Sequence, residues 1–392
     1  MAAFAIITAL LVSAIAQADH TAWQKLQCQH VRTMSDLPDL PHPYITVARE
    51  DLVERATIVP ADQTRRHTAV KTYTIKSDSQ DNLSNLHVVL KEFVPRPKEV
   101  IALCRELRAL IVLHQDGFHP NIIPLIGVAR YRQTIDRRAP WYNHAATYVM
   151  TKLAPKGALI EVDGAPEVNW LPRVFLDVAF ALVHARSKNI FHGDIKPDNI
   201  VLDEDGRAQV IDWEMSYTAD ELGKSRFVVG TPGYIAPEGS VDGVVPFQTP
   251  VQLDFHKIQC HIMGRGLCDK SDVFSFGATL LEMIRDPQLI CTRCRFDDLR
   301  ETYRSEDWIH DFINCAEHCM KEEPIERPDY PDVLKELIEA VSHISGANPP
   351  VHTPKTDKRS RSSFDNGQLL SPPTTPPPQD HTRNVFDFPL AV

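Results

Sequence analysis

The chain has 392 residues, which is too long for one ordinary hydrophobic core and fits about two to three packing units. Hydrophobic residues make up 43% and charged residues 24%, which excludes a wholly disordered chain and a multi-span membrane protein. The 42 Lys and Arg against 52 Asp and Glu give a net charge of −10, which argues against nucleic acid as a partner.

The two ends of the chain differ from its middle. Residues 1–18 carry no charged side chain, and Ala16-Gln17-Ala18 has the small-x-small form of a signal-peptide cleavage site, although the usual basic n-region is missing. A secretory signal and a tolerated apolar N-terminus both remain open. We expect a proline-punctuated linker over residues 19–43 and a disordered, proline-rich tail over residues 345–392. The tail could bind an SH3-type or WW-type domain, or stay solvated.

Between residues 44 and 344 the pattern changes from strands to helices. Residues 67–76, 86–93 and 145–153 are β-branched or aromatic runs that predict strands. Before the last of these runs, four residues fall on one face of a helix: Val100, Leu103, Leu107 and Leu110. Helical spacing then begins at Val174, and residues 271–285 predict a long apolar helix. We therefore expect an α+β domain with a small β-rich lobe over residues 44–153 and a mainly helical lobe over residues 154–344.

The eight cysteines are too sparse for a disulfide-stapled scaffold. Two cysteine pairs have spacings that suggest a structural zinc site: Cys291 with Cys294, and Cys315 with Cys319. Further potential ligands precede them: His256, Cys260, His261 and Cys268. Because the second pair has helical spacing instead of the tight spacing of a zinc knuckle, we favour buried thiols over a metal.

The most informative stretch is His192-Gly193-Asp194-Ile195-Lys196-Pro197-Asp198-Asn199, which is followed by two short apolar runs around an acidic turn. These runs predict a hairpin whose ends present Asp194, Asn199 and Asp212 together. Oxygen ligands and a carboxylate base on one rim suit magnesium-assisted phosphoryl transfer. Taken singly, each acid is more often a solvated loop residue or a helix cap.

This stretch resembles the catalytic loop of eukaryotic-type protein kinases, H-R-D-x-x-x-x-N followed by D-F-G. Gly193 replaces the arginine, and Trp213-Glu214 replaces phenylalanine-glycine. The same two departures occur in small-molecule phosphotransferases similar to aminoglycoside and choline kinases, which share the bilobal fold. The catalytic loop alone therefore leaves both families open.

Three later motifs resemble serine/threonine protein kinases and are absent from the small-molecule enzymes. Residues 230–238 (GTPGYIAPE) look like the substrate-docking loop. Residues 270–277 resemble the start of the central helix, whose Asp272 would brace the catalytic loop. The resemblance further implies that Arg327 pairs with Glu238.

The resemblance implies a role for each candidate site residue. Asp194 would be the catalytic base, and Lys196 would neutralise charge on the transferring group. Lys91 would hold the α and β phosphates of ATP with Glu106 as its partner, and Asn199 and Asp212 would bind Mg²⁺. The nucleotide base would lie among a gatekeeper, a hinge and four apolar residues: Met150, Thr151–Leu153, Val70, Val89, Val201 and Leu202. Core packing is an equal interpretation for those four.

The glycine-rich loop of the family is absent from residues 59–68, where backbone amides would have to approach the phosphates. Three functions follow. The first is an ATP- and magnesium-dependent serine/threonine kinase acting on proteins. The alternatives are a pseudokinase scaffold with weak nucleotide binding and a small-molecule phosphotransferase. Because the proposed chemistry needs ATP, we expect the protein to stay in the cytoplasm despite its apolar N-terminus. The secretory pathway is the alternative, and membrane association stays open.

Glycine at position 193 also bears on how the expected kinase activity is regulated. Without the arginine beside Asp194, a phosphate on the activation segment, which runs between Asp212 and Glu238, has less positive charge to pair with. We therefore expect activity that does not depend on phosphorylation of four hydroxyl residues: Ser216, Tyr217, Thr218 and Ser225. The alternative is that Arg207 or Arg226 supplies the missing charge.

Overall fold

The computed structural model describes residues 20–59, 70–75, 87–93, 95–130, 147–161, 170–221, 230–239, 268–284, 296–304 and 307–342. The chain divides into two units, residues 1–352 and 353–392, and all described residues belong to the first. The expectations for residues 1–18, the proline-rich tail and the glycine-free loop lie wholly or mostly outside these residues. Within them, no helix combines the length and the apolar character needed to cross a membrane.

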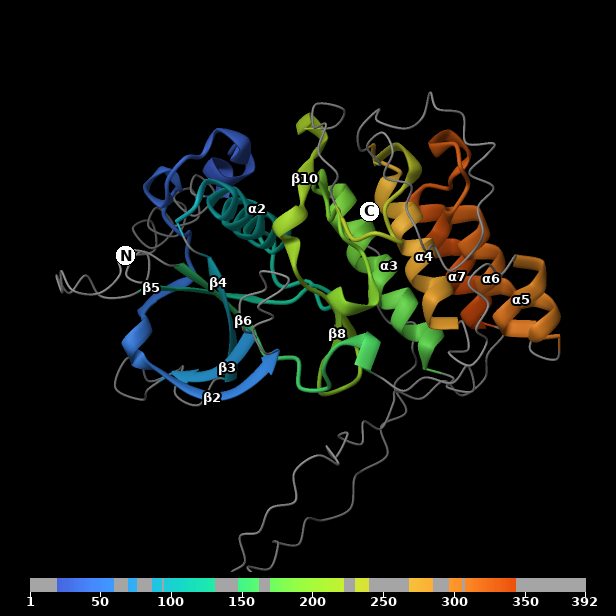
Figure 1. The fold of residues 1–392 in the computed structure, drawn as a ribbon, viewed down its shortest axis with the longest axis horizontal. Helices are drawn as coiled ribbons and strands as arrows, with labels where there is room; N and C mark the ends of the chain where they lie inside the picture. Colours follow the sequence, from blue (N-terminus) through green and yellow to red (C-terminus); the bar gives the residue numbers. More distant parts are fainter. Residues whose placement is uncertain are drawn as a thin grey trace, which may run out of the picture. The chain divides into compact units, whose positions relative to one another are not determined.

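A six-stranded sheet forms the first lobe (Figure 1). Its strands in spatial order are β1 (Ile45–Ala48), β5 (Leu125–Arg130), β6 (Thr147–Lys152), β4 (His87–Phe93), β3 (Val70–Ile75) and β2 (Leu52–Val59). All neighbours are antiparallel except β1 and β5, which are parallel. Side chains alternate between the two faces of each strand, so β4 buries Val88 and Leu90 on one face and presents Lys91 on the other.

Helix α2 (Pro97–Leu113) belongs to the same lobe, and proline at its first position fits the missing amide hydrogen there. Leu103, Leu107 and Leu110 are buried, as their spacing predicts. They belong to an apolar cluster that continues into the helical lobe, so α2 lies where the two lobes meet.

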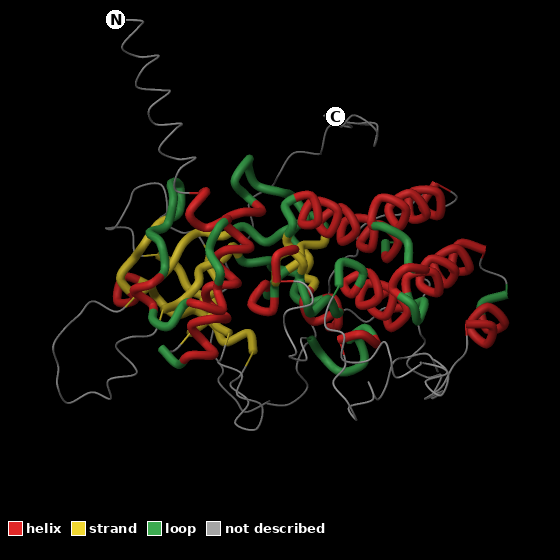
Figure 2. The backbone as a smooth tube through the Cα atoms, turned by 90° about the horizontal axis from the view of Figure 1, so that it is seen from above, coloured by secondary structure: helices red, strands yellow, loops and turns green. Residues whose placement is uncertain are grey.

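The second lobe is mainly helical, and Figure 2 shows its helices separated from the strands of the first lobe. Its helices are α3 (Leu171–Ser187), α4 (Ser271–Ile284), α5 (Phe296–Thr302), α6 (Asp307–Cys319) and α7 (Tyr330–Ser342). Two short strand pairs accompany them: β7 (Ile190–Phe191) with β10 (Tyr217–Thr218), and β8 (Ile200–Leu202) with β9 (Ala208–Val210). Gly277 lets α4 approach α6, since a Cβ there would lie 2.6 Å from the Cβ of Cys319. The predicted α+β bilobal fold class is confirmed.

A disulfide joins Cys28, in the segment before the sheet, to Cys104 on α2. Both cysteines are fully buried beside Val31 and Val100. Trp23 in the same segment is also fully buried, and its indole N–H donates to the carbonyl of Asp39 at 3.0 Å. The N-terminal segment is therefore packed and covalently attached to α2, a link that the cysteine count did not predict.

We expect the Cys28–Cys104 disulfide to stabilise the fold, because it closes a loop of 76 residues in the unfolded chain. Reduction by a dithiol should lower the free energy of unfolding by roughly 2–5 kcal/mol, measured by urea denaturation. The control is the double variant Cys28→Ser/Cys104→Ser, which should unfold at the same midpoint with and without reductant. Equal midpoints for oxidised and reduced wild-type protein would contradict a stabilising link.

Candidate active site

The catalytic-loop backbone is fixed by a buried carboxylate. Asp272, at the start of α4, accepts the backbone N–H of His192 at 2.5 Å and that of Gly193 at 2.8 Å. Gly193 has φ 82°, a left-handed conformation that favours glycine. Burial raises the pKa of Asp272, and the two amides lower it in part. The expected bracing of the loop by Asp272 is therefore present.

His192 supports the same loop from its other side. Its Nε2 lies 2.8 Å from the carbonyl of Ile211, and its Nδ1 accepts the backbone N–H of Asp194 at 3.1 Å. The ring also packs on Trp213, with ring centroids 4.6 Å apart. A proton on Nε2 satisfies both nitrogens, so the neutral ring joins the catalytic loop to the segment that carries Asp212.

Two of the candidate site residues, Lys196 and Asn199, both contact Asp194. Oδ2 of Asp194 lies 3.0 Å from Lys196 Nζ and accepts Asn199 Nδ2 at 3.2 Å. Asn199 Nδ2 also donates to the backbone carbonyl of Asp194 at 2.8 Å. Lys196 Nζ donates to Thr231 Oγ1 at 2.7 Å, which ties the docking loop to the catalytic loop. Oδ1 of Asp194 is buried and has no hydrogen-bond partner among the residues that the structure describes.

Lys91 on β4 lies among three carboxylates. Its Nζ is 2.5 Å from Asp212 Oδ1, 2.8 Å from Glu214 Oε2 and 3.7 Å from Glu106 Oε2 on α2. Asp212 has φ 64° and ψ 65°, a left-handed conformation that is uncommon outside glycine and often marks functional positions. The structure thus brings Lys91, Glu106 and Asp212 together. Glu214, two residues after Asp212, is an additional partner that the sequence analysis missed.

These charges set the ionisation of the site. Burial would lower the pKa of Lys91, but Asp212, Glu106 and Glu214 outweigh it and raise the pKa well above its ordinary value. Burial raises the pKa of Glu106 to about 7, against the opposing effect of Lys91. Burial opposes ionisation of Asp212 as well, yet the contact with Lys91 lowers its pKa. Lys91 therefore stays protonated and Asp212 ionised near neutral pH, and Glu106 is the carboxyl that titrates there.

Two residues expected around a nucleotide base lie elsewhere. Opposite residues of an antiparallel pair share a face, and β4 and β6 pair Lys91 with Val149 and Leu90 with Met150. Met150 is fully buried with Leu90 in a cluster on the face away from Lys91. Leu202 is also fully buried, in the core. Neither side chain reaches the site.

The remaining residues expected around the base fit better. Val89 and Thr151 lie opposite each other on the face of Lys91, and both are half-buried. Val201 is half-buried, on the alternate face of β8 from Leu202. Leu153 is half-buried, but its N–H already donates to the carbonyl of His87 at 3.3 Å. Val70 begins β3, opposite Val59, and its side chain lies outside the described part of the chain.

The predicted pairing of Arg327 with Glu238 is present and fully buried. Arg327 Nη1 and Nη2 donate to the two carboxylate oxygens at 2.7 and 2.8 Å, and the side chains are 0% and 2% exposed. Ser271 Oγ donates to the same carboxylate at 2.7 Å. This pair fixes the end of the docking loop to the start of α4.

The cysteines considered for zinc are only partly described. Cys315 and Cys319 are buried thiols on α6, and Cys268 is a half-buried thiol. Cys291, Cys294 and the His256–His261 group lie outside the described residues.

Removing one partner of the Arg327–Glu238 pair leaves a buried charge uncompensated. We expect Arg327→Gln to lower the free energy of unfolding by about 3–5 kcal/mol, measured by urea denaturation. The control is Arg304→Gln, because Arg304 pairs with Glu301 at 2.5 Å with both side chains largely exposed. That change should cost less than about 1 kcal/mol. Similar losses for the two variants would show that burial does not strengthen the pair.

Comparison with known proteins agrees with this geometry. A family model described as protein kinase domain matches residues 62–344. The leucine-rich repeat receptor-like protein kinase PEPR2 of Arabidopsis thaliana is 26% identical over 256 residues, 59% of this chain and 23% of that protein. The probable serine/threonine-protein kinase kinX of Dictyostelium discoideum is 24% identical over 230 residues, 56% of this chain and 18% of that protein.

The salt tolerance receptor-like cytoplasmic kinase 1 of Oryza sativa subsp. japonica is 26% identical over 284 residues, 63% of this chain and 68% of that protein. The chain thus spans less than a quarter of the length of the first two relatives, and about two thirds of the third. Because the family model matches well over half of the chain, the chain belongs to the protein kinase domain family.

Proposed function

We propose that the protein transfers a phosphoryl group from ATP, with magnesium, to serine or threonine hydroxyls of other proteins. The observation that carries the proposal is Asp194 Oδ1, a buried carboxylate oxygen that has no hydrogen-bond partner within the described part of the chain and lies beside a fixed lysine. A buried acceptor left open in this way suits a group that must receive a hydroxyl hydrogen from a substrate.

The two oxygens of Asp194 have separate tasks in this proposal. Lys196 and Asn199 hold Oδ2, so the carboxylate cannot rotate freely. Oδ1 then orients the substrate hydroxyl and accepts its proton as the hydroxyl oxygen bonds to the γ-phosphorus of ATP, while the bond from that phosphorus to the bridging oxygen breaks and ADP leaves. Lys196 places a positive charge beside the Asp194 carboxylate, and its bond to Thr231 keeps the docking loop in register with the catalytic loop. This link supports a protein substrate held in extended form along that loop.

The donor set fits a magnesium ion and a nucleotide. The Asn199 amide nitrogen is committed to Asp194, so its oxygen remains for a cation, together with the ionised carboxylate of Asp212. When bound, magnesium would neutralise charge on the phosphates during transfer. Lys91 would turn from Asp212 and Glu214 toward the phosphates, with Glu106 as its remaining partner. Thr151 and Val89 would border the base.

One observation favours the pseudokinase scaffold as a second candidate. Lys91 is held by Glu214 at 2.8 Å as well as by Asp212, and the family motif has glycine where Glu214 stands. A phosphate must therefore compete with an extra carboxylate for Lys91. Together with the glycine-free loop, this competition would weaken nucleotide binding.

The direct test uses ATP labelled on its γ-phosphate, magnesium and a degenerate peptide library. Asp194→Asn should lower kcat by about 10²–10⁴, because a positioned general base is lost, and it should leave ATP binding unchanged. The control is Asp198→Asn, an exposed residue of the same loop that should keep wild-type turnover. Acid hydrolysis of the product should yield phosphoserine and phosphothreonine. ATP binding without any labelled peptide would favour the scaffold, and phosphotyrosine would overturn the acceptor class.

The disulfide bears on where the protein works. Disulfides persist in oxidising compartments and are rare in the cytosol, so Cys28–Cys104 supports the secretory alternative over the cytoplasmic one. We expect a C-terminally tagged protein expressed in eukaryotic cells to leave by the secretory pathway with its N-terminus at Asp19. Thiol labelling should find Cys28 and Cys104 oxidised. An uncut chain with both thiols free would place the protein in the cytoplasm instead.

A further inference from the structure

The start of the activation segment lies along α2 and is bonded to it at two successive points. Ser216 Oγ donates to the backbone carbonyl of Arg105 at 3.2 Å. Further on, Glu221 forms an ion pair with Arg108. These contacts join the segment that follows Asp212 to the helix that carries Glu106.

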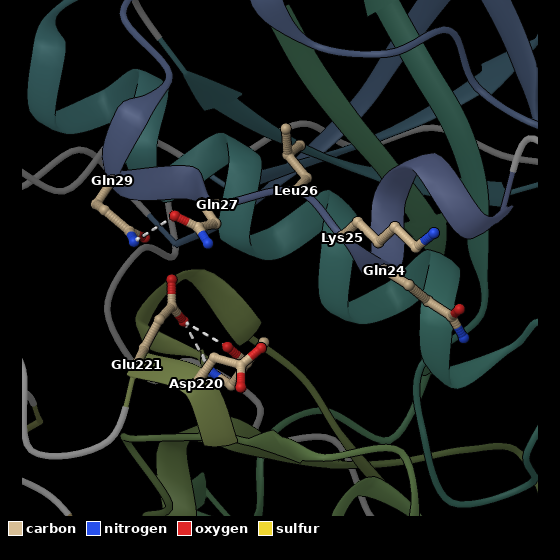
Figure 3. Close-up of a pocket in the computed structure, with 8 residues that line it drawn as sticks. Gln24, Lys25, Leu26, Gln27, Gln29, Asp220 and Glu221 are labelled. Carbon is tan, nitrogen blue, oxygen red and sulfur yellow. Dashed lines mark hydrogen bonds between the residues drawn. The ribbon is translucent and has the colours of Figure 1, made fainter.

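The Arg108–Glu221 pair is buried and two-pronged. Arg108 Nη2 lies 3.0 Å from Glu221 Oε2 and Nη1 lies 3.3 Å from Oε1, with side chains 1% and 9% exposed. Nη1 also donates to the carbonyl of Leu26 at 3.0 Å. Figure 3 shows Glu221 and Asp220 facing the N-terminal residues Gln24–Gln29 across a small polar pocket. Arg108 thus links the N-terminal segment, α2 and the activation segment.

The carboxylate of Glu221 is ionised and well supplied with donors. Burial would raise its pKa, but Arg108 outweighs burial and lowers it. Oε2 also accepts the backbone N–H of Thr218 at 2.8 Å and the Thr218 hydroxyl at 3.3 Å. Glu221 thus accepts two hydrogen bonds from one guanidinium and two more from Thr218. A phosphate on an activation segment is held by arginine in the same way, so Glu221 can serve as the same kind of anchor.

Hydroxyls of the same stretch are already engaged. Ser216 is 0% exposed and Tyr217 is 4% exposed, with the Tyr217 hydroxyl donating to the carbonyl of Cys268 at 3.3 Å. Thr218 bonds to Glu221 itself. Ser225 and Arg226 lie outside the described residues. A modifying enzyme would have to unfold the segment to reach Ser216 or Tyr217.

We propose that Arg108 and Glu221 are positioning residues that hold the activation segment against α2 without phosphorylation. The inference rests on the proposed kinase function, and it identifies the contact that holds α2 and the activation segment of that active site together. Because Gly193 replaces the arginine of the family motif, position 193 supplies no guanidinium beside Asp194. The anchor comes from α2 instead, where Arg108 binds the carboxylate of Glu221, a group that needs no modification. The pair fixes the position of α2, and with it the distance from Glu106 to Lys91.

The test compares Arg108→Met, Glu221→Gln and their combination with the exposed control pair Arg304→Met and Glu301→Gln. All proteins are treated with phosphatase and assayed on the peptide library well below their melting midpoints. Glu221→Gln should lower kcat at least tenfold with little change in KM for the peptide, and the combination should lose no more than the worse single variant. The control variants should stay within twofold of wild type.

The outcomes separate this proposal from simple stabilisation. A purely structural pair would lower the melting midpoint while the folded enzyme kept its kcat, and that result would overturn the proposal. Loss of tenfold or more on phosphatase treatment of the wild type would overturn it too. If the wild type transfers no phosphate, the kinase function fails, and hydrogen exchange then decides on the anchor. Glu221→Gln should speed exchange across residues 97–113, and unchanged exchange would exclude the anchor.

Discussion

The positive charge of Lys91 is the feature on which the ionisation of the surrounding carboxylates depends. Three carboxylates from α2 and from the segment after β9 approach its ammonium within 2.5 to 3.7 Å. Without that charge the carboxylates would repel each other in a region largely withdrawn from water. The sheet supplies the cation, and α2 and the segment after β9 supply the anions. The ionisation of the cluster therefore depends on how these elements pack together.

The balance between catalysis and scaffolding is decided in the same cluster. Asp194, Lys196 and Asn199, the residues proposed for the transfer step, are joined by contacts that do not involve Lys91. The nucleotide half is less open, because Glu214 occupies the lysine that phosphates would need. In the proposed function, the residues that would meet the acceptor hydroxyl are well ordered. On the nucleotide side, Glu214 would compete with the phosphates for Lys91. In the proposed function, Glu214 falls on the nucleotide side, whereas Gly193 lies in the catalytic loop beside Asp194.

Local patterns foretold much of this arrangement, and long-range contacts account for what they missed. The strands around Val88 and Val149, helix α4 and the contact of Asp194 with Asn199 follow from spacing within short stretches. The strand β1 and the Cys28–Cys104 link depend on partners far away in the chain, with no signal in either segment alone. Met150 shows the limit within a strand, because a shift of one residue in register moves a side chain to the other face. The Arg108–Glu221 pair could not be predicted either, because its two residues are 113 positions apart in the chain.

The N-terminal attachment also changes what counts as one folding unit. The family match begins at residue 62, yet α2 is held by Cys28, by the carbonyl of Leu26 and by an apolar cluster that includes Val31. A chain shortened to the matched residues would leave Cys104 as an unpaired thiol on an uncovered helix face and would deprive Arg108 of one acceptor. Such an exposed thiol and apolar surface promote cross-linking and association between copies. The boundary of the shared family domain and the boundary of the stable domain in this protein are therefore different places.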